Sequence, residues 1–261
     1  MHSSAFLFRV FLSFIVGGLY IGLMTRVSEK FGSKIGGLLI ALPSIVLVGL
    51  VFIAITQGQG TLVAATTIMP ANIAASTIFL VVFVLAYRYG LFLAYIAALL
   101  VWFAITITLI SLGLHSMQWP IVVALVLFVI SLTFFHQQPH TTLPPTQFSK
   151  QELLFRTAFA GTFVALAVLL TKILGAHWGG LFASFPAAFS SIVILLAPKH
   201  GIKFTASLSR AMVNGALANA VFVIAIYALV PGMGVLIGML VAYLICLAFA
   251  LFSYQYIMPR V

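Results

Sequence analysis

The side chains best suited to chemistry in this sequence are the hydroxyls and amides that lie near two prolines inside apolar segments. A proline within a helix removes one backbone donor and displaces the carbonyl four residues earlier, so polar groups are left there without helical partners. If a helix restarts after the proline, its free N–H groups and its dipole favour an anionic or carbonyl group. The candidate substrate-binding residues are Pro43, Ser44, Asn72, Ser184, Pro186, Ser190, Ser191 and Asn214.

Each candidate also has a plainer interpretation. The prolines could be ordinary kinks, and serines within helices often hydrogen-bond to their own carbonyls one turn back. The amides of Asn72 and Asn214 could join helices, with about 0.6 kcal/mol for each such bond. Arg156 and Arg210 are each within a turn of a predicted helix end, and their side chains could simply extend to the membrane interface.

The sequence lacks the groups on which most enzymes depend. It has 12 Lys and Arg but only 2 Asp and Glu, which excludes a site built from several carboxylates. Glu29 is expected in a cytoplasmic loop and Glu152 at the mouth of a helix, so no acid is expected at the membrane midplane. There is no Walker sequence, no zinc motif and no Ser–His pair within one helix. We expect no enzyme, no metal site and no cofactor, although carbonyls and hydroxyls at a broken helix could hold sodium.

The composition indicates the surroundings in which these residues work. Charged residues make up 5% of the chain and hydrophobic residues 64%, and the mean hydropathy is +1.29. A soluble domain carries about 25% charged residues and needs them to cover its surface. The sequence therefore predicts an all-α integral membrane protein. The single cysteine, Cys246, lies in an apolar run and is expected to be a buried structural thiol.

The chain contains enough apolar segments for nine transmembrane helices, each of about 20 residues. The fifth is the shortest, and a polar linker follows it from His136 to Glu152. The predicted spans are 5–24, 35–56, 62–86, 91–112, 119–135, 153–174, 179–198, 207–230 and 233–253.

The cations support this count and orient the chain. Lys and Arg concentrate on the cytoplasmic side of a membrane, and nine spans leave only Arg9 and Lys172 on the other side. Without a crossing at 119–135 the division would be seven against five. We expect the inner (cell) membrane, with the amino terminus outside and the carboxyl terminus cytoplasmic. This cationic face suits anionic lipid headgroups and not nucleic acid. The cytoplasmic cations are Arg26, Lys30, Lys34, Arg88, Lys150, Arg156, Lys199, Lys203, Arg210 and Arg260.

Two halves of the sequence match at an offset of 143 residues (186 − 43). Residues 32–43 and 175–186 both have the pattern G-x-x-x-G-G-L-x-x-x-x-P. Glycine and proline have particular effects on backbone conformation, so their alignment in two segments is hard to obtain by chance. Since five spans separate the copies, the copies must have opposite orientations in the membrane. The predicted organisation is a four-helix repeat at 1–116, a linking helix and loop at 117–150, and an inverted four-helix repeat at 151–261. Such inverted repeats are typical of secondary transporters.

The repeated G-G-L-x-x-x-x-P segment within a four-helix apolar unit resembles small uncharacterised prokaryotic membrane proteins that contain this unit once. The resemblance covers most of both halves and excludes the linking helix and its loop. It implies a fused, two-copy version of a unit that would otherwise pair as an antiparallel dimer, and it implies no substrate or reaction. The motif residues are Gly36, Gly37, Leu38 and Pro43 in the first copy, and Gly179, Gly180, Leu181 and Pro186 in the second.

These features together predict a secondary transporter for a small anionic or amphipathic substrate. Its site would lie between the second, third, seventh and eighth helices, and one half would rock against the other to alternate access. The alternatives are a lipid flippase or scramblase and a non-transporting membrane assembly partner. The expected partners are the lipid bilayer and a small-molecule or lipid substrate.

Overall fold

The computed structural model describes residues 3–30, 43–113, 116–138 and 147–256, and their regular structure is entirely helical. The prediction of an all-α protein is confirmed for these residues. The α-helices are α1 (Ser3–Lys30), α3 (Ser44–Gln57), α4 (Gln59–Thr66), α5 (Met69–Ala86), α6 (Leu91–Ser111), α7 (Gln118–His136), α8 (Lys150–Leu174), α9 (Ala176–Ala183) and α10 (Ala187–Tyr256). A short 3₁₀ helix, η1 (Tyr87–Tyr89), follows α5.

Six helices of the described ranges are long and apolar enough to cross a membrane. Large apolar side chains point outward from them, including Leu236, Phe92 and Leu154 with 84%, 75% and 68% of their surface exposed. A surface of this kind is compatible with lipid and incompatible with water. The chain is therefore a multi-pass helical membrane protein.

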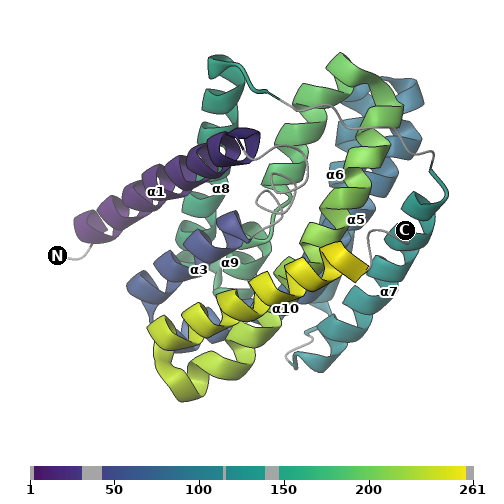
Figure 1. Cartoon of the computed structure of the whole chain (residues 1–261). Coiled ribbons are helices and arrows are strands. Elements are labelled where there is room, and N and C mark those ends of the chain that lie inside the picture. Colours follow the sequence, from purple (N-terminus) through teal and green to yellow (C-terminus); the bar gives the residue numbers. More distant parts are fainter. Residues whose placement is uncertain (1–2, 31–42, 114–115, 139–146, 257–261) are drawn as a thin grey trace.

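Glycines divide α10 into shorter helices. Gly201 (φ 78°, ψ 177°) and Gly234 (φ 76°, ψ 169°) have conformations that L side chains rarely adopt, and the chain turns at each of them. Residues 187–200, 202–233 and 235–256 are therefore separate helical segments, and Figure 1 shows the chain of α10 folding back on itself.

Two of the predicted spans are not continuous helices. The predicted span 62–86 is interrupted at residues 67–68, between α4 and α5, and the span 179–198 is interrupted at residues 184–186, between α9 and α10. The sequence left open whether the helix at Pro186 is broken or only kinked, and it did not predict the interruption at residues 67–68; Pro70 and Pro186 each lack a backbone donor. In both places the proline lies within the first two helical positions or directly before them.

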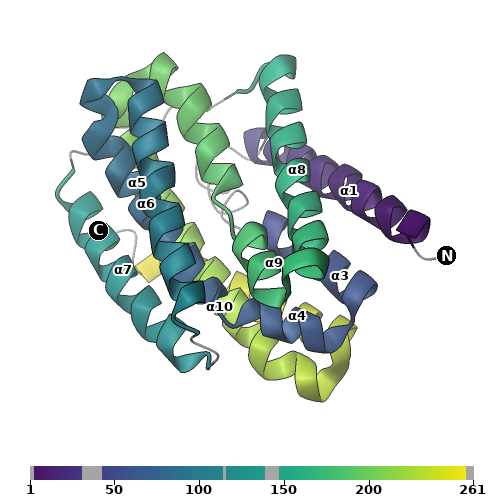
Figure 2. The same cartoon turned by 180° about the vertical axis from the view of Figure 1, so that it is seen from behind.

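The helices form two groups with a mixed centre. α1, α3 and α8 lie on one side of the molecule and α5, α6 and α7 on the other, with α9 and parts of α10 between them (Figures 1 and 2). Figure 2 also shows α4 and α9 next to each other, well away from α7. Cys246 is buried, as expected, and its thiol contacts the Ala218 carbonyl at 3.2 Å.

The crossing of α1 and α8 depends on glycines that occupy matching positions in the two halves. A Cβ on Gly18 would lie 2.8 Å from the Thr157 carbonyl oxygen, and a Cβ on Gly161 would lie 2.5 Å from the Phe14 carbonyl oxygen. Gly161 follows Gly18 by 143 residues, and Thr157 follows Phe14 by the same number. The two contacts are thus exchanged between the halves, as in an isologous interface.

Other positions at the same offset share their backbone geometry. Gly58 has φ 88° and ψ 171°, close to the values of Gly201, and each glycine turns the chain between two helices. The carbonyl of Pro43 accepts from the Leu47 amide at 2.9 Å, and the carbonyl of Pro186 accepts from the Ser190 amide at 2.7 Å. Both prolines therefore stand directly before a helix and begin its hydrogen bonding.

The charged residues of α1 and α8 separate to two ends. Arg26, near the last residue of α1, bonds to the Phe148 carbonyl just before α8, whereas Lys172 near the end of α8 lies 4.1 Å from the centre of the Phe6 ring. The two helices are therefore antiparallel. Glu29 belongs to α1, which corrects its expected place in a loop, because α1 continues to Lys30.

The predicted linker is shorter than expected. Ser149 caps α8 and accepts from the Glu152 amide at 3.3 Å, while the Glu152 carboxylate accepts from the Ser149 amide at 2.9 Å. This capping box makes residues 150–152 helical, and α7 extends to His136. Residues 139–146 of the linker lie outside the described ranges.

Candidate functional site at two helix breaks

The break between α9 and α10 is made by three residues. The amide of Ser184 still donates to Gly180 O at 3.0 Å and that of Phe185 to Phe182 O at 3.3 Å, so α9 ends with a tightened turn. Pro186 has no amide hydrogen and disfavours a helical conformation at Phe185. The helix restarts at Ala187, whose amide donates to Phe185 O at 2.7 Å. The helix is therefore broken here, and not merely kinked.

Aromatic rings enclose this break. The ring of Phe185 stacks on that of Phe163 with 3.6 Å between centroids and 3° between planes. Its edge also meets Trp102 at 5.1 Å. The aromatic cover keeps the break away from the lipid, which cannot satisfy its backbone groups.

The second break, at residues 67–68, lies against α9. A Cβ on Gly180 would overlap the carbonyl oxygen of Ala65 and lie 3.4 Å from Met69 Cγ. One on Gly179 would overlap the Thr171 hydroxyl. The motif glycines of the second copy therefore permit close helix contacts, which is their plainer interpretation. At Gly180 this contact places α9 beside the break at residues 67–68, one helical turn before the break at 184–186.

Asn72 lies on the face of α5 that points to α9. Met69 meets Gly180 on this face, and the Ser76 hydroxyl lies 3.5 Å from the carbonyl oxygen of Ser184. Residues three and four apart share a helix face, so Asn72 lies between these two contacts. Its side chain is fully buried, and neither Oδ1 nor Nδ2 has a hydrogen-bond partner.

An unpartnered buried amide is costly, at about 1–3 kcal/mol for each unsatisfied group. Buried polar groups are almost always hydrogen-bonded, and an exception indicates an unseen water, an ion or a functional role. Asn72 beside a broken helix is therefore the strongest candidate for a group that binds something other than the protein.

Trp102 completes the polar environment and was not predicted from the sequence. Its indole Nε1 donates to the Ser76 hydroxyl at 3.1 Å and lies 3.4 Å from the Asn72 carbonyl oxygen. Ser76 in turn donates to that carbonyl at 3.1 Å. No spacing in the sequence connects α6 with α5 and α9, so only the tertiary contacts identify Trp102 and Phe185.

The remaining candidates of α10 have separate surroundings. Ser190 lies beside the hydroxyl of Tyr95, and Ser191 donates to Ala188 O at 2.9 Å, one turn back in its own helix. Asn214 donates to Arg210 O at 3.4 Å, and its Oδ1 has no partner. No described contact brings these three side chains to Asn72.

The first-copy candidates are described only in part. Pro43 is buried and immediately precedes α3. Ser44 is the first residue of α3, and its side chain lies outside the described part of the structure. Gly36, Gly37 and Leu38 also fall outside it, within 31–42.

The two acids lie away from both breaks. Glu29 is at the end of α1 and Glu152 in the first turn of α8, and both are bound to cations and amides of this end of the molecule. Among the described residues no three His, Cys, Asp or Glu side chains gather in a way that could hold a metal ion. The breaks thus offer amides, hydroxyls and carbonyls to a ligand.

Fold and site together define a multi-pass helical membrane protein whose two halves are copies of one unit. The chain belongs to the family described as a protein of unknown function (DUF3147), whose model matches residues 10–117 and again residues 153–258. The second match starts 143 residues after the first (153 − 10), which is the offset of the sequence repeat. No curated protein and no solved structure matches the chain.

Proposed function

We propose that this protein is a secondary transporter whose substrate site lies between the two helix breaks. The substrate is small and anionic or amphipathic, and access alternates as one half of the molecule rocks against the other. The single observation that carries this proposal is the unpartnered, fully buried amide of Asn72 beside the Ser184–Pro186 break. Discontinuous helices near the centre of a duplicated bundle are the usual location of transporter sites.

The proposal includes nine spans in two inverted four-helix repeats joined by α7. Three of these spans are the segments of α10 at 187–200, 202–233 and 235–256, of which the first continues from α9 across the break. α4 and α5 form one interrupted span, and α3 is the second half of another. The antiparallel α1 and α8, with their exchanged glycine contacts, support a pseudo-two-fold axis in the membrane plane.

The lack of acids near the breaks bears on how transport would be coupled. Glu29 and Glu152 are both occupied at one end of the bundle, and a proton-coupled carrier usually needs an acid within the membrane. We therefore propose that transport is driven without a buried acid. The driving force would be exchange, the gradient of the substrate itself, or sodium held by carbonyls and hydroxyls at the breaks.

Cysteine accessibility tests the proposal without knowledge of the substrate. Single cysteines at Ser44, Asn72, Ser184, Ser190 and Asn214 are introduced into a Cys246→Ala background and labelled in sealed vesicles with a charged thiol reagent, separately from each side. A transporter requires that Asn72 and Ser184 variants react, and that the reactive side depends on conformation or added solute. If none reacts from either side, the proposal is wrong.

Two matched controls accompany this labelling. A cysteine at Gln147, which is exposed before α8, must react from the cytoplasmic side only, and one at Ala242, which is fully buried in α10, must remain unreactive. Reaction at Ala242 would indicate an unfolded protein and not a water-filled site.

The lipid-handling alternative is favoured by the aromatic surroundings of the break, where Phe163, Phe185 and Trp102 could accommodate an apolar body. It is tested in liposomes that contain a fluorescent phosphatidylcholine, by the fraction of dye bleached with external dithionite. Loss of about half the fluorescence is the baseline for an inactive protein. Nearly complete bleaching that disappears on Phe185→Ala would support a scramblase.

A further inference from the structure

Arg156 is a buried cation that the proposed transport mechanism has not yet used. It lies in the second turn of α8 with 3% of its surface exposed, and its Nε and Nη1 groups have no hydrogen-bond partner. The Arg156 side chain is therefore enclosed by protein, and Arg210 is likewise buried. The ring of Phe148 covers the guanidinium, with its centre 4.5 Å from the Arg156 Cζ atom.

No acid of the chain is bonded to Arg156. The sequence has only two acids. The Glu29 oxygens accept from Arg26 Nη1 and from the Phe148 amide, each at 2.7 Å. The Glu152 oxygens accept from Lys199 and from the Ser149 amide. Neither carboxylate has a hydrogen bond to Arg156; the Glu29 charge lies near the guanidinium without contacting it, so Arg156 lacks a counter-ion in direct contact.

A buried charge without a paired and hydrogen-bonded partner is among the most unfavourable arrangements in a protein. Such a group persists where it has a use, since replacing it with an apolar side chain would otherwise stabilise the fold. Guanidinium N–H groups match the oxygens of carboxylates and phosphates. The missing partner of Arg156 is therefore an oxyanion.

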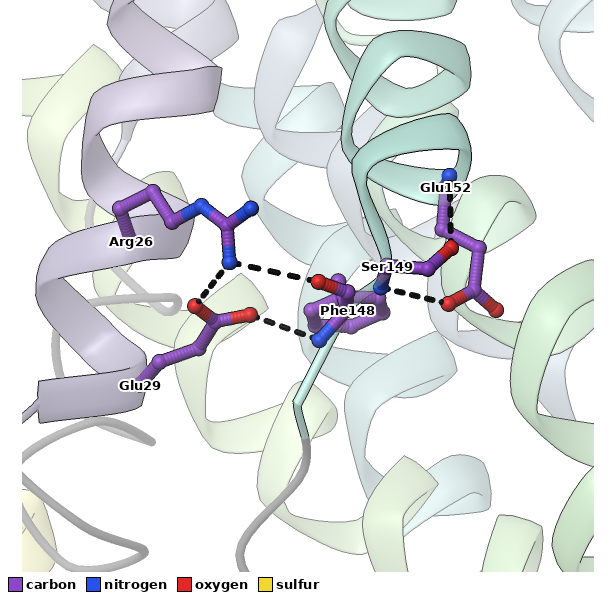
Figure 3. Close-up of polar contacts among 5 residues, drawn as sticks. All are labelled: Arg26, Glu29, Phe148, Ser149 and Glu152. Atoms are coloured by element: carbon purple, nitrogen blue, oxygen red, sulfur yellow. Dashed lines mark hydrogen bonds and ion pairs between the residues drawn. The ribbon is translucent and has the colours of Figure 1, made fainter.

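The cover over Arg156 is held by bonds that can be broken. Figure 3 shows Glu29 and Arg26 of α1 reaching the backbone of Phe148 from one side, while Ser149 and Glu152 form the cap of α8 beside it. We call the Arg26–Glu29 pair with its two bonds to Phe148 the latch. Release of the latch would let Phe148 move away and open Arg156 to the cytoplasmic end.

One face of α8 links Arg156 to the helix break. Phe159 and Phe163 lie three and seven residues after Arg156 on this face, and the Phe163 ring stacks on Phe185. Seven residues of helix span about 10 Å. A ligand bound at Arg156 would therefore be one substrate length from the break.

We propose that Arg156 binds the carboxylate or phosphate oxygens of the transported substrate, beneath Phe148 and behind the latch. This inference rests on the proposed function, because only a transporter would make the bound anion a substrate. Binding itself is measured on solubilised protein and needs no transport. If the protein binds the anion but its cysteine variants are not labelled, the anion site is supported and the transport proposal is wrong.

The test uses the full chain in dodecyl maltoside and follows its thermal unfolding with and without inorganic phosphate, with sodium chloride at equal ionic strength as reference. Phosphate should raise the unfolding temperature of the wild type by about 2–4 °C at concentrations well above the dissociation constant. Arg156→Met should abolish this rise. Arg88→Met removes an exposed cation and should retain it.

Comparison of the wild type and Arg156→Met without phosphate distinguishes a binding role of Arg156 from a structural one. Arg156→Met without phosphate should unfold at the wild-type temperature or above it, because the variant loses an unpaired buried charge. A lower unfolding temperature, or a phosphate response that survives in Arg156→Met, would overturn the proposal. Mixed micelles with phosphatidylglycerol, compared with phosphatidylcholine, identify the source. An Arg156-dependent response to phosphatidylglycerol and not to free phosphate assigns the same site to a lipid headgroup.

Discussion

At the scale of single residues, the protein keeps polar groups buried at a cost to its stability. Asn72 has no partner for either amide atom, whereas buried Thr77 and Ser131 satisfy each other through hydroxyls 2.7 Å apart. Ser184, the polar residue of the break, donates to Gly180 O one turn back at 2.7 Å. Of these side chains, Asn72 is the one with no hydrogen-bond partner among the described residues and so the one available to a ligand; elsewhere the Ser190 hydroxyl and Asn214 Oδ1 also lack a partner.

Replacing Asn72 with leucine should therefore leave stability unchanged or raise it by about 1 kcal/mol, because an unsatisfied amide is removed. Ser131→Ala is the matched control, and it should lower stability by about 1 kcal/mol since the hydrogen bond between the Thr77 and Ser131 hydroxyls is lost. Unfolding in detergent with increasing denaturant measures both. A large loss of stability in Asn72→Leu would mean that its amide is satisfied within the fold.

The latch can be tested by one isosteric substitution. Glu29→Gln weakens the bonds to Arg26 and to the Phe148 amide, and it removes a negative charge near Arg156. We expect the concentration of phosphate that gives half of the thermal shift to fall severalfold, since less free energy is needed to uncover Arg156. Arg88→Met should leave this concentration unchanged. A rise in Glu29→Gln would contradict the role of the latch.

At the scale of elements, a glycine contact holds α9 against the break between α4 and α5. Gly180→Ala should push α9 away from α4, because its Cβ would overlap the backbone carbonyl of Ala65, which cannot yield as a flexible side chain does. Overpacking of this kind costs about 1–3 kcal/mol. Gly232→Ala is the control, since a Cβ there meets open space in a helix. It should be neutral or slightly stabilising, as measured by denaturant unfolding.

The elements also show the limit of length and hydropathy as predictors. The spans 62–86 and 179–198 were identified because both are apolar throughout, and an apolar run does not by itself reveal a break. Pro186 did indicate the second break, since a proline ends a helix wherever the tertiary structure provides other partners for the freed groups. At residues 67–68 the sequence offered Pro70, whose effect was underestimated.

At the scale of the whole molecule, the two halves contribute equal contacts to the crossing of α1 and α8. Gly18→Ala and Gly161→Ala should destabilise the protein by similar amounts of about 1–3 kcal/mol, because each new Cβ meets the equivalent carbonyl of the other half. Gly60→Ala, with open space at its Cβ, serves as the control. Clearly unequal effects of the first two substitutions would argue against a pseudo-symmetric crossing.

Membrane orientation belongs to this scale as well. Fusions of a phosphatase or a fluorescent protein within 139–146 should report the cytoplasm, because Arg26, Arg156 and Lys199 lie at the end of the bundle next to this linker. A fusion before α1 should report the outside. A periplasmic signal from the linker would overturn the proposed orientation and the inverted arrangement with it.

The sequence by itself determined the class of protein, the helical content and the duplication. The apolar composition indicates that the protein is surrounded by lipid, and the length of the apolar segments indicates helices. The glycines and prolines that recur at an offset of 143 indicate the duplication, which the double family match supports. These properties depend on local chemistry or on comparison of the chain with itself, and neither requires packing to be known.

Only the tertiary structure decided which polar groups are satisfied. Ser184 and Ser191 were as promising as Asn72 in the sequence, yet each donates to a carbonyl of its own turn. The side-chain amide of Asn72 and the Nε and Nη1 groups of Arg156 have no hydrogen-bond partner in the described part of the structure. Whether a buried group is satisfied depends on neighbours far apart in the chain, such as Trp102, Gly180 and Phe148. Hydropathy and residue spacing do not reveal those neighbours. The lack of hydrogen-bond partners at Arg156 is therefore evident only in the tertiary structure.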